Sequence, residues 1–117
     1  MSGSVCYHAG LAAEDIVARN YSDRGFVLKA ARWRGQGGEI DLIVEDADTL
    51  VFVEVKKSRD FASAAARLSR RQMQRIYASA DGYLGESERG LDSNARFDVA
   101  LVDQGGAVEI LENAFGQ

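Results

Sequence analysis

A strand-like alternation near the middle of the chain constrains its fold more than any other feature. Residues 50–56 read Leu-Val-Phe-Val-Glu-Val-Lys, with valine at every second position. Successive side chains of a β-strand point to opposite faces, so the three valines share one face and Glu54 and Lys56 share the other. The sequence therefore predicts a strand that presents a carboxylate and an ammonium group side by side.

The preceding stretch, residues 39–44, has the same period of two. Its apolar side chains at positions 40, 42 and 44 share one face, and Glu39, Asp41 and Ile43 share the opposite face. If residues 45–49 connect two antiparallel strands, Asp41 becomes a neighbour of Glu54 and of the lysine beside it. The two stretches together predict a hairpin with two carboxylates and an ammonium group on one face.

The remaining patterns place this hairpin in an α/β (α+β mixed) fold, one domain covering residues 1–117. Successive hairpins favour antiparallel pairing of the first three strands, and a helix before the fourth favours a parallel crossover. The result is a mixed sheet flanked by helices. The expected elements are a helix over 7–23 ended by Gly25, a strand over 26–34, a glycine-rich hairpin turn over 35–38, the two strands above, a short helical turn within 58–67, a helix over 69–86, and strands over 96–103 and 107–111.

Composition excludes several kinds of site. The chain has one cysteine and one histidine, which rules out a disulfide framework and a zinc site of thiolate or imidazole ligands built from this chain alone. It has no apolar run near the roughly 18 residues of a membrane span and no signal-peptide layout at its start. We expect a cytoplasmic protein without a membrane partner.

Charge is distributed unevenly along the sequence. The whole chain carries a net charge of −4, but residues 56–75 hold seven basic residues and one acidic residue, a net +6 that leaves −10 elsewhere. A basic segment directly after a group of acids suits a polyanion held beside metal ions, and the simpler alternative is a solvated helix face. The candidate nucleic-acid contacts are Lys57, Arg59, Arg70, Arg71 and Arg75.

Two polar residues have alternative explanations. Glu14 falls within the apolar stripe of the first helix, where an ionised carboxylate needs a partner such as an arginine, access to water, or a cation near the sheet. Gln72 either closes a capping box that Ser69 begins, which we favour, or offers its amide to the site on the sheet.

Two residues on strands are better explained by structure than by catalysis. Asp98 alternates away from the apolar face of its strand, and we expect it to accept structural hydrogen bonds. Trp33 is expected to pack on its own sheet, although together with Arg32 and Arg34 it could also contact a nucleic-acid backbone.

The acid pair has a definite chemistry if the hairpin forms. Two carboxylates about 4 Å apart repel by roughly 4 kcal/mol at an effective dielectric constant of about 20, so Asp41 and Glu54 imply a bound cation or a raised pKa. Oxygen ligands favour Mg²⁺ or Mn²⁺, and such an ion beside Lys56 suits phosphodiester hydrolysis. The alternative is a cross-strand salt-bridge set on a solvated face, because Glu-x-Lys is common by chance.

Several motifs together resemble a known family. They are Gly10-x-x-Ala13-Glu14, residues 38–43 and 51–56, Arg75-Ile76 with Ala80 and Tyr83-Leu84, and Arg96-Phe97-Asp98-Val99. They resemble the YraN family of small bacterial proteins, which is similar to the restriction-endonuclease-like PD-(D/E)xK nucleases, including archaeal Holliday-junction resolvases.

The resemblance implies a core of helix, three strands, helix and strand. It implies Asp41 and Glu54 as Mg²⁺ or Mn²⁺ ligands, Lys56 as the catalytic lysine and Glu14 as an additional acid, and it leaves Glu39 without a clear role. The implied activity is endonuclease-like hydrolysis of DNA that is branched or damaged, and a homodimer would match the junction-cleaving relatives. The alternatives on the same fold are a non-catalytic nucleic-acid-binding module and a protein-interaction domain.

The chain departs from the family pattern at two positions. Gln72 stands where the family usually has a lysine, and Arg32 stands where it often has an asparagine. Neither change removes a predicted metal ligand.

Overall fold

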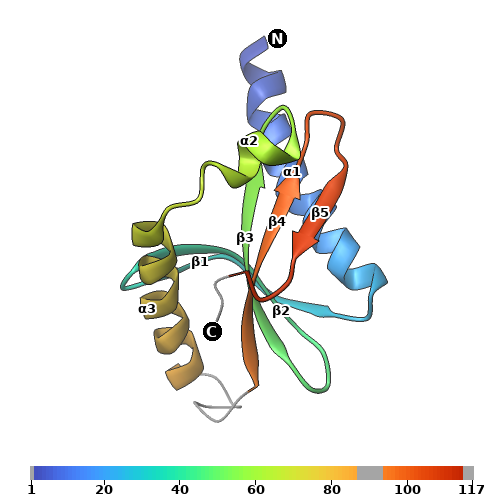
Figure 1. The fold of residues 1–117 in the computed structure, drawn as a ribbon. Helices are drawn as coiled ribbons and strands as arrows, with labels where there is room; N and C mark the ends of the chain where they lie inside the picture. The colour runs from blue at the N-terminus through green and yellow to red at the C-terminus, as the bar shows by residue number, and fades with distance from the viewer. Residues whose placement is uncertain (1, 87–93, 115–117) are drawn as a thin grey trace.

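The sheet and its helices follow the predicted order. The computed structural model describes residues 2–86 and 94–114, and within the first helix it describes side chains from Ala13 onward. The elements are α1 (Ser2–Asp23), β1 (Val27–Gly35), β2 (Gly38–Glu45), β3 (Leu50–Lys57), α2 (Phe61–Ala65), α3 (Arg70–Glu86), β4 (Ala95–Val102) and β5 (Val108–Leu111) (Figure 1). The predicted mixed α/β fold is confirmed.

The five strands form one sheet in the order β1-β2-β3-β4-β5. β1 pairs with β2 and β2 with β3 in antiparallel fashion, β3 pairs with β4 in parallel, and β5 returns antiparallel to β4. The parallel pair requires the crossover that α2 and α3 provide. The sheet therefore puts β3, which carries the charged pair, at its centre.

Local signals fix the ends of the helices. Gly25 has φ of 95°, a left-handed conformation that glycine adopts without steric cost, and it ends α1. Asp60 caps α2 through a 2.7 Å bond from the Ser63 N–H to its side chain. Ser69 caps α3, because its Oγ accepts the Gln72 N–H at 3.1 Å.

Helices cover both faces of the sheet. On one face, side chains of α1 such as Val17 and Tyr21 pack on a core that includes Val51 and Val53, as the alternation predicts. On the other face, α3 and the short α2 form two further clusters, one around Phe52 and one around Val99 and Leu101.

One detail of the predicted alternation is wrong. Ile40 was expected on the same face as Leu42, but it packs with Ile43 in the cluster under α3. The pairing of β2 with β3 begins only at Leu42, so the part of β2 before it is free to depart from the pleat. In β1, Arg32 lies between the partners of Leu42 and Ile40 and has φ of 54°, so the backbone is irregular there too.

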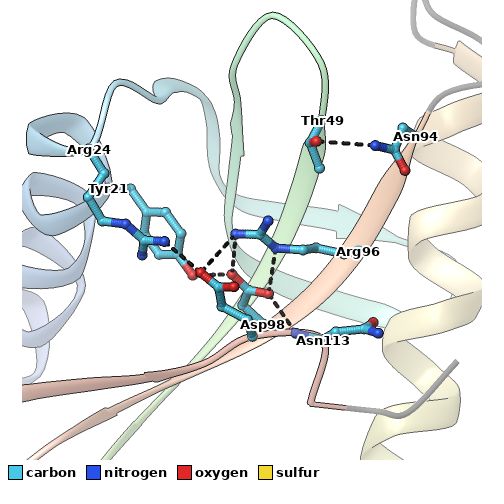
Figure 2. A network of polar contacts seen from close by, with 8 residues as sticks. Tyr21, Arg24, Thr49, Asn94, Arg96, Asp98 and Asn113 are labelled. Carbon is cyan, nitrogen blue, oxygen red and sulfur yellow. Dashed lines mark hydrogen bonds and ion pairs between the residues drawn. The ribbon is translucent and has the colours of Figure 1, made fainter.

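A buried network joins α1, β4 and the segment after β5 (Figure 2). Asp98 is completely buried and accepts hydrogen bonds from the Tyr21 hydroxyl at 2.7 Å, from Arg96 Nε and Nη2 at 3.0 and 3.2 Å, and from the Asn113 N–H at 3.0 Å. Burial and the neighbouring Asp98 carboxylate raise the pKa of Tyr21 far above its usual range. The structural role expected of Asp98 is confirmed, and this network is separate in the sheet from the charged pair on β3.

The closed end of the β1–β2 hairpin is fastened to α3. The Ser79 hydroxyl donates to the carbonyl oxygen of Gly38 at 2.8 Å. A Cβ at Gly37 would lie 2.1 Å from the carbonyl oxygen of Arg75, so only glycine allows this close approach. The glycine-rich turn is thus the hairpin connection expected from the sequence, and α3 positions it.

Within the described part of the chain, no helix is both long enough and apolar enough to cross a membrane.

Candidate functional site

Glu54 lies on β3, on the sheet face that α2 and α3 cover. Its strand neighbour Val53 belongs to the core under α1, whereas Phe52 belongs to the core under α3. Glu54 is only 5% exposed, and the Nζ of Lys56 lies 3.3 Å from its Oε2. The strand therefore holds the carboxylate and the ammonium group together, in a place that is nearly closed to water.

Asp41 lies where β2 separates from β3. The two strands pair from Leu42 opposite Val53, and beyond that point the Val55 N–H donates to Asp41 Oδ2 at 2.8 Å. The Asp41 carboxyl also lies close enough to that of Glu54 for the two to interact. A side-chain acceptor thus takes the place of a backbone acceptor at the end of the ladder, and it holds the second carboxyl group against the first. No sequence pattern indicated the contribution of the Val55 N–H.

Asp41 keeps its proton at neutral pH. The pKa of Asp41 is raised from 3.8 to about 8, first by burial and then by the interaction with Glu54 and its negative charge. The Val55 N–H and the charge of Lys56 act in the opposite direction. A cation bound beside Asp41 and Glu54 could take the place of the proton that Asp41 retains.

Gln72 reaches this pair from the first turn of α3. Its backbone N–H is capped by Ser69, but its side-chain Nε2 donates to Glu54 Oε2. The favoured interpretation, in which the Gln72 side chain closes the capping box, is therefore wrong. A hydrogen bond to a buried carboxylate is stronger than one to a solvated backbone N–H, and this favours the contact of Gln72 with Glu54.

Glu14 has an arginine partner. Its Oε1 accepts from Arg32 Nε at 3.0 Å, in an ion pair at the edge of the sheet. Among the residues that the structure describes, no three or more histidine, cysteine or acidic side chains are grouped so as to hold a metal ion. The structure thus assembles Asp41 and Glu54 but does not add Glu14 to them, and its role as an additional acid stays a prediction.

Glu39 interacts with an arginine of β1 and not with the acid pair. It is opposite Arg34 in the β1–β2 ladder, and the Arg34 Nη2 is 4.0 Å from its Oε2. Both side chains are well exposed, so this ion pair contributes little to stability.

The basic residues from Lys57 to Arg75 lie at the end of β3, on α3 and in the segment between them. Lys57 is half-buried, and its carbonyl oxygen accepts from Arg67 Nη1 at 2.9 Å. Arg59 is exposed and lies 3.6 Å from Asp60. Three further arginines are exposed on the first turns of α3, the helix that also carries Gln72; they are Arg70, Arg71 and Arg75.

The fold and this cluster define the class of the protein. It is a mixed α/β domain whose central strand carries a buried pair of carboxyl groups, with a lysine on the same strand and an amide from the crossover helix bonded to one of them. The described chain supplies only oxygen ligands at this pair, which suits a hard divalent cation and does not suit zinc.

The chain belongs to the uncharacterised protein family UPF0102, whose model matches residues 13–102. A UPF0102 protein of Cereibacter sphaeroides strain KD131 is 57% identical over 115 residues, which cover 98% of each chain. A UPF0102 protein of Roseobacter denitrificans is 51% identical over 116 residues, which cover 99% of this chain and 90% of the relative. The matched region includes every residue of the cluster on β2, β3 and α3.

Proposed function

We propose that this chain is a Mg²⁺- or Mn²⁺-dependent phosphodiesterase that acts on nucleic acid, with branched or damaged DNA as its substrate. One observation carries the proposal. Asp41 and Glu54 interact in a nearly buried site, and the Lys56 ammonium lies 3.3 Å from Glu54 Oε2. A cross-strand salt bridge on a solvated face would not bury two acids against each other.

The acid pair fits a magnesium-type ion. Mg²⁺ is usually bound by one or two carboxylates together with waters and the phosphate of a substrate, and Asp41 and Glu54 offer that number of carboxylates. The two acids come from adjacent strands and are held by the Val55 N–H and by Gln72, so their positions do not depend on the cation. Such an ion, when bound, polarises a phosphate oxygen and lowers the pKa of a coordinated water.

Lys56 and Gln72 have separate parts in this proposal. The Lys56 ammonium lies 3.3 Å from Glu54 Oε2, so it would offset the negative charge that grows on a phosphate during hydrolysis beside the acid pair. Gln72 donates to one oxygen of Glu54 and thereby fixes the orientation of that carboxylate. Glutamine in place of the family's lysine provides this contact without adding a second positive charge.

The exposed arginines of α3 supply affinity for the backbone of the substrate. They lie in the first two turns of the helix that carries Gln72, so their charges are near the end of α3 that meets the acid pair. Contacts of this kind are sequence-independent and weaken as salt displaces them.

Cleavage of a panel of linear, flapped and four-way DNA substrates tests the proposal. We expect cleavage that requires Mg²⁺ or Mn²⁺ and falls at least 100-fold in Glu54→Gln and in Asp41→Asn, because each variant removes one of two ligand charges. Glu39→Gln is the matched control, since it removes an exposed carboxylate of β2 and should leave the rate unchanged. No cleavage of any substrate by the wild type, or equal cleavage by Glu54→Gln, would overturn the proposal.

A second candidate function is nucleic-acid binding without turnover, which the exposed arginines of α3 favour. It predicts salt-sensitive binding in which Glu54→Ala leaves the affinity unchanged or increases it by removing repulsion. If no nucleic acid binds even at low salt, a protein-interaction domain becomes the better explanation.

A further inference from the structure

A hollow lies along α3, away from the acid pair. It is a pocket of about 670 Å³ between the closed end of the β1–β2 hairpin and the C-terminal half of the helix. Residues 33–36 line it from the hairpin, and Ala78, Asp81, Gly82 and Glu86 line it from α3. Since Ser79 bonds the hairpin to the helix, both walls are held in place by structure that is already formed.

Glycine keeps an aromatic wall of this pocket uncovered. A Cβ at Gly82 would meet Trp33 Cη2 at 3.7 Å, an ordinary contact, and nothing else within 4 Å. Packing therefore does not require glycine at this helical position, where glycine is a poor helix former. Trp33 lines the pocket and packs edge to face with Tyr83, and the absence of a side chain at Gly82 leaves the ring uncovered on the side of that position.

The polar groups around this ring suit a nucleobase. Arg34 and Gln36 bring hydrogen-bond donors from the hairpin, and Asp81 and Glu86 bring acceptors from the helix. An aromatic side chain that stacks on a base, with polar groups at the rim to read its edge, is the usual way in which proteins hold unpaired nucleotides. The two carboxylates repel a phosphate and accept hydrogen bonds from an exocyclic amine, so they favour cytosine, adenine or guanine over thymine and uracil.

The pocket and the acid pair lie on one line along α3. Gln72 bonds to Glu54, and Gly82 is ten residues further along the helix, which corresponds to about 15 Å at a rise of roughly 1.5 Å per residue. That length equals about four nucleotides of a strand with B-form spacing of roughly 3.4 Å. Arg75 is exposed between the two places and can hold a phosphate of the intervening strand.

We propose that this pocket receives an unpaired, amine-bearing nucleobase of the same strand whose backbone passes the acid pair. This inference rests on the proposed function, because it assigns the substrate class of that site. A substrate with an unstacked base a few nucleotides from the cleaved bond would then be preferred over a fully paired duplex.

Tryptophan fluorescence tests the proposal directly, because Trp33 is the one tryptophan of the chain. The full chain, in EDTA so that no cleavage occurs, is titrated with single-stranded oligonucleotides of dC, of dT and of abasic sugar-phosphate, each of equal length. We expect quenching by dC with roughly tenfold tighter binding than dT, and weaker binding still of the abasic strand. A parallel titration with the ribonucleotide cytosine strand shows whether RNA or DNA is the better source of the base.

A pair of glycine variants makes the result specific. Gly82→Leu fills the pocket and should abolish the preference for dC while residual backbone binding remains. Gly85→Leu adds the same side chain to the same helix at a position with nothing within 4 Å, and should keep the preference. Both changes replace glycine by a better helix former, so both proteins should fold, which thermal unfolding checks.

The outcomes separate this inference from the proposed function. Equal binding of dC, dT and abasic strands, no binding of any of them, or an unchanged dC preference in Gly82→Leu overturns the base pocket even if the protein cleaves DNA. A dC preference that Gly82→Leu removes supports the pocket even if no substrate is cleaved, and then only the proposed hydrolysis fails.

Discussion

Replacement of Asp41 by asparagine should change how the stability of the metal-free protein depends on pH. The pKa of Asp41 is raised from 3.8 to about 8 in the folded protein, mainly by burial and by Glu54. The folded protein therefore keeps a proton that the unfolded chain has released. The stabilisation from this proton is complete below about pH 4 and is lost as the pH rises through about 8.

The size of the effect follows from proton linkage. One retained proton changes the free energy of unfolding by at most about 1.4 kcal/mol per pH unit. Between pH 5 and 8 we expect the free energy of unfolding to fall by an amount on the order of 2 kcal/mol, which is below the full slope because the site is not completely closed to water. For a domain of this size that loss lowers the midpoint of thermal unfolding by roughly 8 °C.

Thermal unfolding in EDTA at half-unit steps from pH 5 to 8.5 measures this slope. Asp41→Asn should flatten it, and Glu39→Gln, which removes an exposed carboxylate from the same strand, should not. Mn²⁺ should stabilise the wild type more at pH 8 than at pH 5, because at the lower pH it competes with the proton. A flat or rising wild-type curve, or the same slope in Asp41→Asn, would refute the description of the acid pair.

Four further variants test other parts of the structure. Tyr21→Phe removes a 2.7 Å hydrogen bond to the buried Asp98 and should cost about 1–3 kcal/mol in urea unfolding; no measurable loss would contradict the network of Figure 2. Gly37→Ala should destabilise the protein by more than about 2 kcal/mol, because the new Cβ would lie 2.1 Å from the carbonyl oxygen of Arg75 in α3. A midpoint of unfolding equal to that of the wild type would show that the hairpin is not held there. Arg32→Asn should leave the stability unchanged or raise it by up to about 1 kcal/mol. Asparagine tolerates a φ of 54° better than arginine does, and the ion pair that is lost is exposed. A loss of stability above about 1 kcal/mol would contradict this explanation. Arg71→Ala should weaken DNA binding and reduce the slope of log affinity against log salt by about 1, as measured by fluorescence anisotropy. An unchanged slope would show that Arg71 does not contact the DNA.

The cluster of Asp41, Glu54 and Lys56 could be predicted because it depends mainly on sequence patterns within two neighbouring strands. A strand alternates with a period of two whatever its surroundings, so Glu54 and Lys56 had to share a face once the segment became a strand. Asp41 required one more assumption, that the short connection makes a hairpin, and the antiparallel pairing of β2 with β3 bears that assumption out. The parallel pairing of β3 with β4 followed in the same way from the intervening helix.

The partners of the polar side chains could not be predicted from the sequence with the same success. Whether Gln72 turns to its own helix or to Glu54 depends on where α3 lies over the sheet, which no local pattern states. The sequence offered an arginine as one partner for Glu14, but it could not name Arg32, whose left-handed backbone on β1 belongs to the assembled sheet.

The pocket at Trp33 shows a different limit. The sequence indicated that the tryptophan packs on its own sheet. In the structure it packs against the cluster between the sheet and α3, and its ring meets Tyr83 of that helix edge to face at a centroid distance of 5.4 Å. The hollow beside it depends on Gly82 lying against the same ring from a helix that is about fifty positions away in the chain, which only the packed structure reveals.

The central claim is that Asp41 and Glu54 form a binding site for a divalent cation. A crystal of the protein soaked in Mn²⁺, with data collected near the manganese absorption edge, tests it most directly. The claim predicts an anomalous peak between the two carboxylates, lost in Glu54→Gln, with each ligand oxygen about 2.0–2.3 Å from the ion. Soaked crystals without a peak between Asp41 and Glu54 would contradict it.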